Sequence, residues 1–524
     1  MNNCVAVLID TVSIQEYIFS SNKLKDNIGA SFIVDNIYKD QLKRALEIVF
    51  KASNININTW RENPDIIQIT QNKVEFEVGY IGGGNALILF KEGERYNRVE
   101  KAKEFVRTFT KMLLEEVPGV KTAFGIAADF NLDKFEDSMK KLHKELQMNK
   151  NKFFSLVTLQ KHGFTLDCPR TDESAEFDKK DEEESFISAV AKAKIEVSKK
   201  ARERMKECYL KNYENEYLFT DEIDKLGQQK NSKNYIAIVH IDGNKIGEKF
   251  KKCESLQEIR KLSIDVENAS QSSFKRIIEE VVDKIKKKII SKENGFYLSS
   301  EDEKTVLPLI PVLIAGDEVT FVCEGRLGIW LAEKYIKELM NYKIQNSVFS
   351  ACAGVSIVKS KYPFYRAYLI AEGLLSRAKR KSRENGNSSY LDFFVSSGGC
   401  SGEIDDILEK HFSTINGNLH FGPYKVDSDC DTNCYNDDSL KYLKENIKGL
   451  LKFPRNKLMR LREALFEEKE IRKLILEEFS VKDLNLPKLP FKKDYITDLW
   501  ENKKTPYFDA IEAIDFYPEG LLNE

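Results

Sequence analysis

Three carboxylates lie where the sequence predicts the ends of buried strands. Asp317 and Glu318 follow an Ala-Gly pair at the tip of a predicted hairpin, and Asp242 ends an apolar run further upstream. Branched and aromatic residues in the flanking runs predict three strands: Leu309–Ile314, Val319–Cys323 and Ile236–Asp242. Because acids and glycine are also common in solvated turns, the hairpin by itself is compatible with an ordinary turn.

The chemistry open to these carboxylates is metal-assisted phosphoryl transfer. If the strand of Asp242 and the returning strand of the hairpin are neighbours in one sheet, the acids converge at one edge. Carboxylate oxygens suit Mg²⁺, which keeps other positions for water and substrate phosphates. Two such ions can activate a ribose hydroxyl and stabilise a pyrophosphate leaving group. Glu318 could complete the second metal site or orient the nucleophile.

Residues near Asp242 favour phosphate binding. The turn Gly243-Asn244-Lys245-Ile246-Gly247 leads into a helix, where free backbone N–H groups can hold a triphosphate. Gly316, in the hairpin, is a further expected nucleotide contact. Lys379 could supply a point charge to the same phosphates, although a lysine within the run Arg377–Arg383 is locally more typical of a solvated helix face.

The same pattern occurs twice along the chain, which indicates an internal duplication. A strand ending in Asp10 precedes a glycine hairpin at Gly84 by 74 positions, and Asp242 precedes Asp317 by 75. Downstream, each copy continues with a helix, a glycine-containing strand and a second helix. The predicted pairs are Tyr96–Glu116 with Leu327–Tyr342, Thr122–Ala127 with Ala351–Ser356, and Asp133–Gln147 with Pro363–Ser382.

This order predicts an α+β fold with two tandem ferredoxin-like palm domains, a helical connecting module and a helical C-terminal domain. The expected boundaries are 1–150 for the first palm, 151–232 for the connecting module, 233–398 for the second palm and 399–524 for the C-terminal domain. The connecting module holds an acid-rich run and a charged helical segment, Ser188–Glu207. Leu440–Phe479 has helical periodicity interrupted at Pro454.

Composition limits the function classes. The 524 residues are 42% hydrophobic, enough for several cores, and 82 Lys and Arg against 84 Asp and Glu give a formal charge of -2. No global positive field therefore recruits nucleic acid. The N-terminus does not resemble a signal peptide, and no apolar run reaches the roughly 18 residues of a membrane span. Nine cysteines without a CxxC pair disfavour a disulfide framework, so a cytoplasmic protein is expected.

The first copy lacks the acids of the second hairpin. Gly84 and Asn85 replace Asp317 and Glu318, so Asp10 has no carboxylate partner there. A metal pair is not expected at this position, but glycines allow a ligand to approach the backbone closely. The simplest division of roles is that one palm is catalytic and the other only holds a nucleotide.

The chain resembles the polymerase-like large subunit of type III CRISPR effector complexes, the Csm/Cmr family, whose palms are related to GGDEF nucleotide cyclases. The family's Gly-Gly-Asp-Asp hairpin corresponds to Ala315–Glu318 here. Other similar stretches are Ile18–Lys25 running to Gly29–Ser31, Gly82–Asn85, Ser356–Pro363 leading to Ala378-Lys379, Gly422–Tyr424 and Phe453–Lys457.

The resemblance implies site residues in both palms. In the first palm, the expected nucleotide-binding residues are Lys23, Ser31, Gly82, Gly83, Gly84 and Asn85. In the second palm, the expected ligands of two Mg²⁺ or Mn²⁺ ions are Asp242, Ile241, Asp317 and Glu318. The family's N-terminal HD nuclease domain is expected to be missing. Cys168 and the distant Cys208 leave only a degenerate zinc-ribbon-like segment, and Cys430 and Cys434 are too loosely placed to predict zinc.

The leading hypothesis is a nucleotidyltransferase that joins ATP or related NTPs into a small signalling oligonucleotide, such as cyclic oligoadenylate, in antiviral defence. Expected partners are NTPs, RNA, small CRISPR subunits and a downstream effector that senses the product, with no membrane. One alternative is a non-catalytic scaffold of an RNA-guided complex, with basic surfaces at Lys284–Lys288 or Arg377–Arg383. A GGDEF-like dinucleotide cyclase is the other alternative.

Overall fold

The computed structural model describes residues 3–71, 74–91, 95–152, 165–171, 173–178, 186–228, 234–396, 398, 402–426, 438–487 and 494–522. Contacts divide the chain into two compact units. Unit 1 comprises 1–208, 245–271 and 312–318, and unit 2 comprises 209–244, 272–311 and 319–524. Among the described helices, none is both long enough and apolar enough to cross a bilayer.

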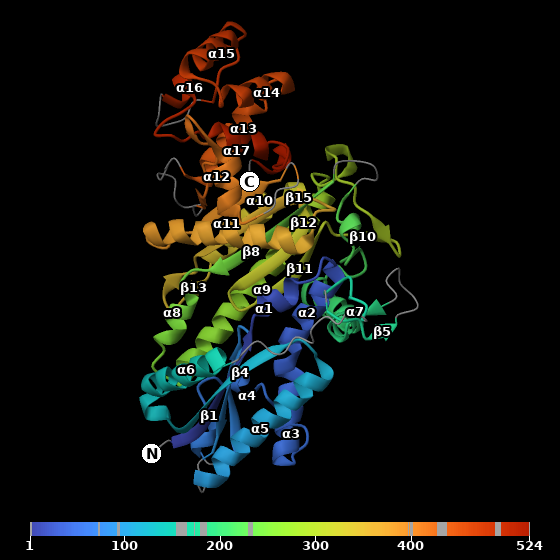
Figure 1. The fold of residues 1–524 in the computed structure, drawn as a ribbon, viewed down its shortest axis with the longest axis vertical. Helices are drawn as coiled ribbons and strands as arrows, with labels where there is room; N and C mark the ends of the chain where they lie inside the picture. The colour runs from blue at the N-terminus through green and yellow to red at the C-terminus, as the bar shows by residue number, and fades with distance from the viewer. Residues whose placement is uncertain are drawn as a thin grey trace. The chain divides into compact units, whose positions relative to one another are not determined.

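The first sheet has four strands in the order β2-β3-β1-β4. Its strands are β1 (Asn3–Val12), β2 (Phe76–Gly82), β3 (Asn85–Phe90) and β4 (Lys121–Asn131). Central β1 runs antiparallel to both β3 and β4, and its residues Val5–Ile9 are fully buried, as expected for a strand covered on both faces. Helices α5 (Arg95–Glu116) and α6 (Phe135–Lys152) both pack on β1 and β4 (Figure 1).

The second sheet repeats this order and extends it, as β11-β12-β8-β15-β16-β19. Its strands are β8 (Tyr235–Gly243), β11 (Leu309–Ala315), β12 (Glu318–Glu324), β15 (Ala351–Lys359), β16 (Tyr390–Val395) and β19 (Tyr424–Lys425). Helices α10 (Gly328–Met340) and α11 (Phe364–Glu384) pack on β8 and β15, as α5 and α6 do on β1 and β4 (Figure 1). The predicted duplication and α+β palm fold are confirmed.

A glycine marks the helix–strand crossing in each copy. A β-carbon on Gly125 in β4 would lie 2.8 Å from the backbone oxygen of Leu142 in α6. A β-carbon on Gly354 in β15 would overlap the backbone oxygen of Ala371 in α11. Only glycine lets the helix backbone approach the strand this closely, which explains the glycine-containing strands of the repeat.

We expect Gly354→Val to lower the unfolding temperature of the second palm, because the added side chain must push α11 away from β15. Overpacking of this kind costs about 1–3 kcal/mol. Thermal unfolding followed by circular dichroism measures the loss. Gly247→Ala is the control, since a β-carbon there meets nothing within 4 Å. An unchanged unfolding temperature for Gly354→Val would show that the crossing tolerates separation.

The remaining elements flank the two sheets. The N-terminal helices are α1 (Ile14–Phe19), α2 (Leu24–Asn36), the π-helical turn Ile37–Gln41, α3 (Leu42–Phe50) and α4 (Thr59–Glu62). The connecting segment contains β5 (Phe177–Asp178), β6 (Phe186–Ile187), α7 (Ala189–Tyr209) and β7 (Tyr217–Leu218). α8 (Ile246–Lys251) and α9 (Leu256–Lys286) follow β8, and β9 (Ser300–Glu301) and β10 (Lys304–Val306) precede β11. A short hairpin, β13 (Lys343–Ile344) and β14 (Ser347–Val348), precedes β15.

The C-terminal part of the described chain is mainly helical. Its elements are α12 (Ile404–Phe412), β17 (Ser413–Thr414), β18 (Gly417–Asn418), α13 (Leu440–Leu450), α14 (Arg455–Ala464), α15 (Lys469–Val481), α16 (Asp494–Asp498) and α17 (Tyr507–Ala513). The predicted interruption at Pro454 is confirmed, because α14 begins directly after it and a proline cannot continue the preceding helix.

Candidate active site

Asp242 lies near the carboxyl end of β8 and forms an ion pair with Lys379 of α11. Both side chains are partly exposed, at 31% for Asp242 and 23% for Lys379, so a ligand can reach them. Lys379 is therefore directed toward the candidate acid rather than along a solvated face. Asp242 is placed by β8, whose flanking residues are buried on both sides of the sheet.

The turn after Asp242 is fixed by the side chain of Asn244. Its amide nitrogen donates to Ser350 Oγ at 3.2 Å and to the backbone oxygens of Asn387 and Ser388, each at 3.4 Å. These bonds hold the turn in place, so the Asn244 amide group stabilises the backbone conformation of the turn. Gly243 is buried, whereas Lys245 is exposed and adopts a left-handed conformation with φ of 58° before α8. The predicted nucleotide contacts of these three residues remain predictions.

The second hairpin places its acids at the start of β12. Gly316 has a φ of 60°, which favours glycine, and Asp317 and Glu318 are half-buried. Gln15 of α1 donates from Nε2 to Glu318 Oε1 at 3.0 Å. The sequence reasoning missed Gln15, because its partner lies 303 positions away and no local pattern connects the two.

The glycine hairpin of the first sheet adjoins the hairpin of Gly316 within unit 1. A β-carbon on Gly316 would lie 3.9 Å from both N and Cα of Gly83. Gly83 has a φ of 58°, and Asn85 stands opposite Asp10 in the antiparallel register of β1 and β3. An amide thus stands opposite Asp10 where the second hairpin carries an acid.

The three glycines of this hairpin differ in how closely other groups pack against them. A β-carbon on Gly82 would lie 2.6 Å from Ser263 Oγ, and one on Gly84 would overlap Ile14. The backbone oxygen of Gly84 also accepts a hydrogen bond from the Tyr38 hydroxyl at 2.7 Å. Packing therefore explains why Gly82 and Gly84 are glycines. Gly83 is more open, because a β-carbon there would lie 3.8 Å from its nearest neighbour, Asn85 Nδ2.

Lys23 and Ser31 both lie at α2. Lys23 precedes the helix with an extended backbone, its side chain is exposed, and its backbone N–H donates to Ser21 Oγ at 3.1 Å. Ser31 is half-buried within the helix. Their roles toward a nucleotide stay predictions. Asp10 instead pairs with Lys150 at the end of α6, a contact that the sequence reasoning missed.

Within the described residues, no group of three or more His, Cys, Asp or Glu side chains is gathered in a way that could hold a metal ion. Ile241 is buried in β8 opposite Ala353 of β15. The donor types still fit the predicted metal, because partly exposed carboxylates at Asp242, Asp317 and Glu318 are hard oxygen ligands. Cys168 is buried and Cys208 is exposed, while Cys430 and Cys434 lie outside the described residues.

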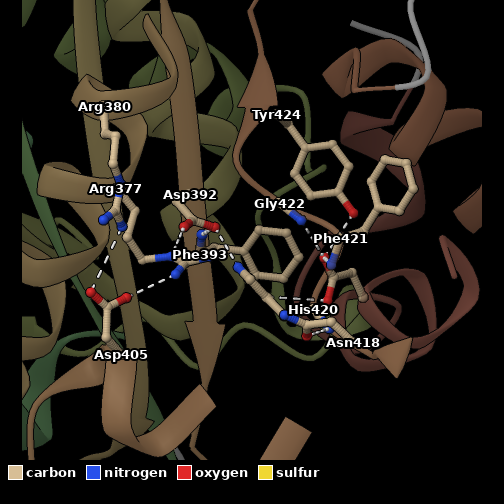
Figure 2. Close-up of polar contacts among 11 residues, drawn as sticks. Arg377, Arg380, Asp392, Phe393, Asp405, Asn418, His420, Phe421, Gly422 and Tyr424 are labelled. Atoms are coloured by element: carbon tan, nitrogen blue, oxygen red, sulfur yellow. Dashed lines mark hydrogen bonds and ion pairs between the residues drawn. The ribbon is translucent and has the colours of Figure 1, made fainter. Parts of the chain in front are cut away.

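A buried charge network supports α11, the helix that carries Lys379. Arg377 donates to Asp392 of β16 at 3.0 Å and to Asp405 of α12 at 2.8 Å (Figure 2). Asp392 is fully buried and also contacts His420 Nε2 at 2.8 Å. Arg377 belongs to one of the two basic runs that could form an RNA-binding surface, but it is only 18% exposed and its charge is paired with Asp392. Lys284, in the other basic run, is 7% exposed.

Asp509 of α17 completes this network. It accepts hydrogen bonds from the backbone N–H groups of Phe421 and Gly422 at 2.9 and 3.1 Å and from the Tyr424 hydroxyl at 2.9 Å. Burial disfavours a charged His420, but Asp392 and Asp509 outweigh it and raise the pKa of His420 to about 10. Burial also acts to raise the pKa of Asp392, yet His420 and Arg377 hold it below its usual value. The network joins the C-terminal helices to the edge of the second sheet.

We expect His420→Ala to destabilise unit 2 by about 3–5 kcal/mol at pH 7, because it removes the charged partner of a buried carboxylate. The stabilisation from His420 is complete below its unfolded pKa of about 6.5 and is lost as the pH rises through about 10. Urea unfolding at pH 7 and above pH 10 measures both effects. Asp405→Ala, which removes a 59% exposed partner of Arg377, should cost less than about 1 kcal/mol. Equal stability of His420→Ala and wild type at pH 7 would contradict a charged His420.

One family of known proteins matches the part of the chain that contains most of the second sheet. Residues 235–387 match the model of the second palm domain of Cas10/Cmr2. This segment is Cas10-like. The matched range includes Asp242, the Asp317–Glu318 hairpin and Lys379, and it lies within the palm predicted for 233–398. No curated protein matches the sequence of the chain.

Solved structures extend the Cas10-like similarity in fold to nearly the whole chain. The Csm1-Csm4 cassette in complex with cA4 is 14% identical, with 98% of this chain and 69% of that chain covered and a TM-score of 0.53. The cassette in complex with cA3 is 14% identical, covers 98% and 70%, and has a TM-score of 0.51. Csm1 from T. onnurineus is 14% identical, covers 98% and 70%, and has a TM-score of 0.50. The fold of nearly the whole chain therefore resembles that of Csm1.

Proposed function

We propose that the chain is a nucleotidyltransferase that joins ATP, or related NTPs, into a small signalling oligonucleotide such as cyclic oligoadenylate. The observation that carries this proposal is the position of the acids in a Cas10-like second palm. Asp242 lies near the end of β8. Glu318 begins β12, which neighbours β8 in the sheet order, and Asp317 directly precedes it.

A side-chain contact connects two strands that the sheet order gives as neighbours. His240 Nδ1 of β8 and Thr320 Oγ1 of β12 are 2.8 Å apart. In the first sheet, Asp10 stands opposite Asn85 in the register of β1 and β3. By analogy with that copy of the repeat, we propose that Asp242 and the acids of the second hairpin serve one site.

The residues of this edge have distinct roles in the proposed reaction. Asp242, Asp317 and Glu318 would hold the metal ions, with the backbone of Ile241 as a further ligand. Bound Mg²⁺ or Mn²⁺ would activate a ribose hydroxyl and neutralise charge on the leaving pyrophosphate. Lys379 would move from Asp242 to the phosphates as a point charge. The backbone at Gly243 to Lys245 and at Gly316 would position the triphosphate.

The first palm would hold the second nucleotide without catalytic acids. Its hairpin offers Gly84 and Asn85 in place of Asp317 and Glu318, and Gly83 leaves room for a ligand near the backbone. Because the hairpins of Gly83 and Gly316 adjoin in unit 1, a nucleotide at one hairpin would lie near the other.

The solved relatives support the proposed ligands and one class of partner. Csm1 structures are described in complex with Csm4, with cA4, with cA3 and with one ATP. We propose by similarity that this chain binds adenine nucleotides and a Csm4-like subunit in the cytoplasm. RNA and a downstream effector that senses the product are further proposed partners, in a setting of antiviral defence.

The proposal is tested by incubating the purified full chain, alone and with its co-purifying subunits and RNA, with each NTP and Mg²⁺ or Mn²⁺. Mass spectrometry should detect oligoadenylates from ATP. A cyclic dinucleotide from GTP alone would favour the GGDEF-like alternative. Retention of RNA and partner subunits without any product would contradict the proposal and favour a scaffold.

A further inference from the structure

Lys150 in the first palm occupies the place that Lys379 occupies in the second. Lys150 lies at the end of α6 and pairs with Asp10 of β1, while Lys379 lies in α11 and pairs with Asp242 of β8. Both pairs are partly exposed, with Lys150 at 29% and Asp10 at 21%. A soluble ligand can therefore reach each pair.

The repeat shows that the two lysines are equivalent. Lys150 follows Gly125 by 25 positions, and Lys379 follows Gly354 by the same 25 positions. These glycines mark the crossings of α6 over β4 and of α11 over β15. The same helix length from the same crossing point brings each lysine back to the aspartate of the adjacent central strand. A chance ion pair does not explain this match in both copies.

We propose that Lys150 binds the polyphosphate of the nucleotide held by the first palm, without a divalent ion. This inference rests on the proposed function, because it assigns a residue and a charge source to the nucleotide-holding palm. An ammonium group has three donors, so Lys150 can contact a phosphate while it remains near Asp10. The Lys150 ammonium group would neutralise phosphate charge in the first palm, as the proposed metal ions would do in the second palm.

The ligand is a polyphosphate group, and it can come from a free NTP or from the 5′-triphosphate of a growing oligonucleotide. ATP and the linear dinucleotide pppApA distinguish these sources, and adenosine is the control without phosphate. Tighter binding of ATP than of pppApA assigns the site to the incoming nucleotide, and the reverse order assigns it to the growing chain.

The test is equilibrium binding of ATP and pppApA to the full chain in EDTA, measured by isothermal titration calorimetry. Wild type should bind at a metal-independent site, and Lys150→Ala should weaken that binding about tenfold, as expected for one charge-assisted hydrogen bond. Lys150→Arg should retain most of the affinity. Lys144→Ala, an exposed charge removal on the same helix, should bind like wild type.

Two outcomes would overturn the inference. One is the absence of metal-independent binding to wild type, and the other is an affinity of folded Lys150→Ala equal to that of wild type. If Lys150→Ala unfolds, Lys150→Gln provides the same comparison with a side chain of similar length. A failure of the proposed function is distinguishable, since it would leave this binding intact while wild type forms no oligonucleotide with ATP and Mg²⁺.

Discussion

Asp317→Ala is expected to abolish oligonucleotide synthesis while the protein remains folded. Asp317 is half-buried at the tip of a hairpin, so its side chain contributes little to packing. Loss of a metal ligand removes stabilisation of the charge that develops in the transition state, and we expect a fall in turnover on the order of 10²–10³-fold or more. Asp242→Ala should have the same effect. Product formation from ATP with Mg²⁺, quantified by mass spectrometry, measures it.

The control for this loss is Asp406→Ala, which removes an exposed acid of α12 away from the hairpin. It should synthesise product at the wild-type rate, and all variants should unfold near the wild-type temperature. Full turnover by folded Asp317→Ala or Asp242→Ala would remove the two-metal mechanism.

The two palms should respond differently to loss of their strand-end charge. Asp242→Asn removes a proposed metal ligand and should lower turnover about as strongly as Asp242→Ala. Asp10→Asn keeps the shape of the side chain opposite Asn85 and releases Lys150 from its ion pair. Because one carboxylate beside an amide is a poor Mg²⁺ site, we expect Asp10→Asn to reduce turnover less than about tenfold.

Steady-state rates at saturating and at low ATP compare these variants. If Lys150 binds phosphate, Asp10→Asn should not weaken ATP binding in EDTA. Equal losses of turnover in Asp10→Asn and Asp242→Asn would show that the roles of the palms were assigned wrongly.

The fold was largely predictable, because the duplication provides each element twice. Buried strands ending in Asp10 and Asp242, two hairpins and the following helices all appear in the structure within a few residues of the predicted bounds. The strand order β2-β3-β1-β4 recurs as β11-β12-β8-β15, as a palm requires. Local periodicity determines these elements, so sequence patterns predict them well.

The network around His420 could not be predicted. His420 contacts Asp392, which lies 28 positions away, and Asp509 of a separate helix. Its charge depends on burial and on both carboxylates, which no local pattern reveals. The stretch Gly422–Tyr424, which the sequence connects only with a family resemblance, has a structural role, since the Gly422 N–H and the Tyr424 hydroxyl both donate to Asp509.

The sequence carries a signal for Lys150 only when the two copies are compared. Its local sequence, Asn149-Lys150-Asn151-Lys152, is typical of a solvated helix end. The equal spacing from Gly125 and from Gly354 would have connected it with Lys379. Comparing the two copies position by position therefore predicts polar contacts that a single helix cannot show.

The most direct test of the central claim, one metal-dependent palm and one metal-free palm, is the anomalous diffraction of Mn²⁺ in crystals of the full chain with a non-hydrolysable ATP analogue. We expect manganese peaks beside Asp242 and Asp317 and none beside Asp10, with nucleotide at both hairpins. A manganese peak at Asp10, or bound nucleotide at Asp317 without any metal, would contradict this division of roles.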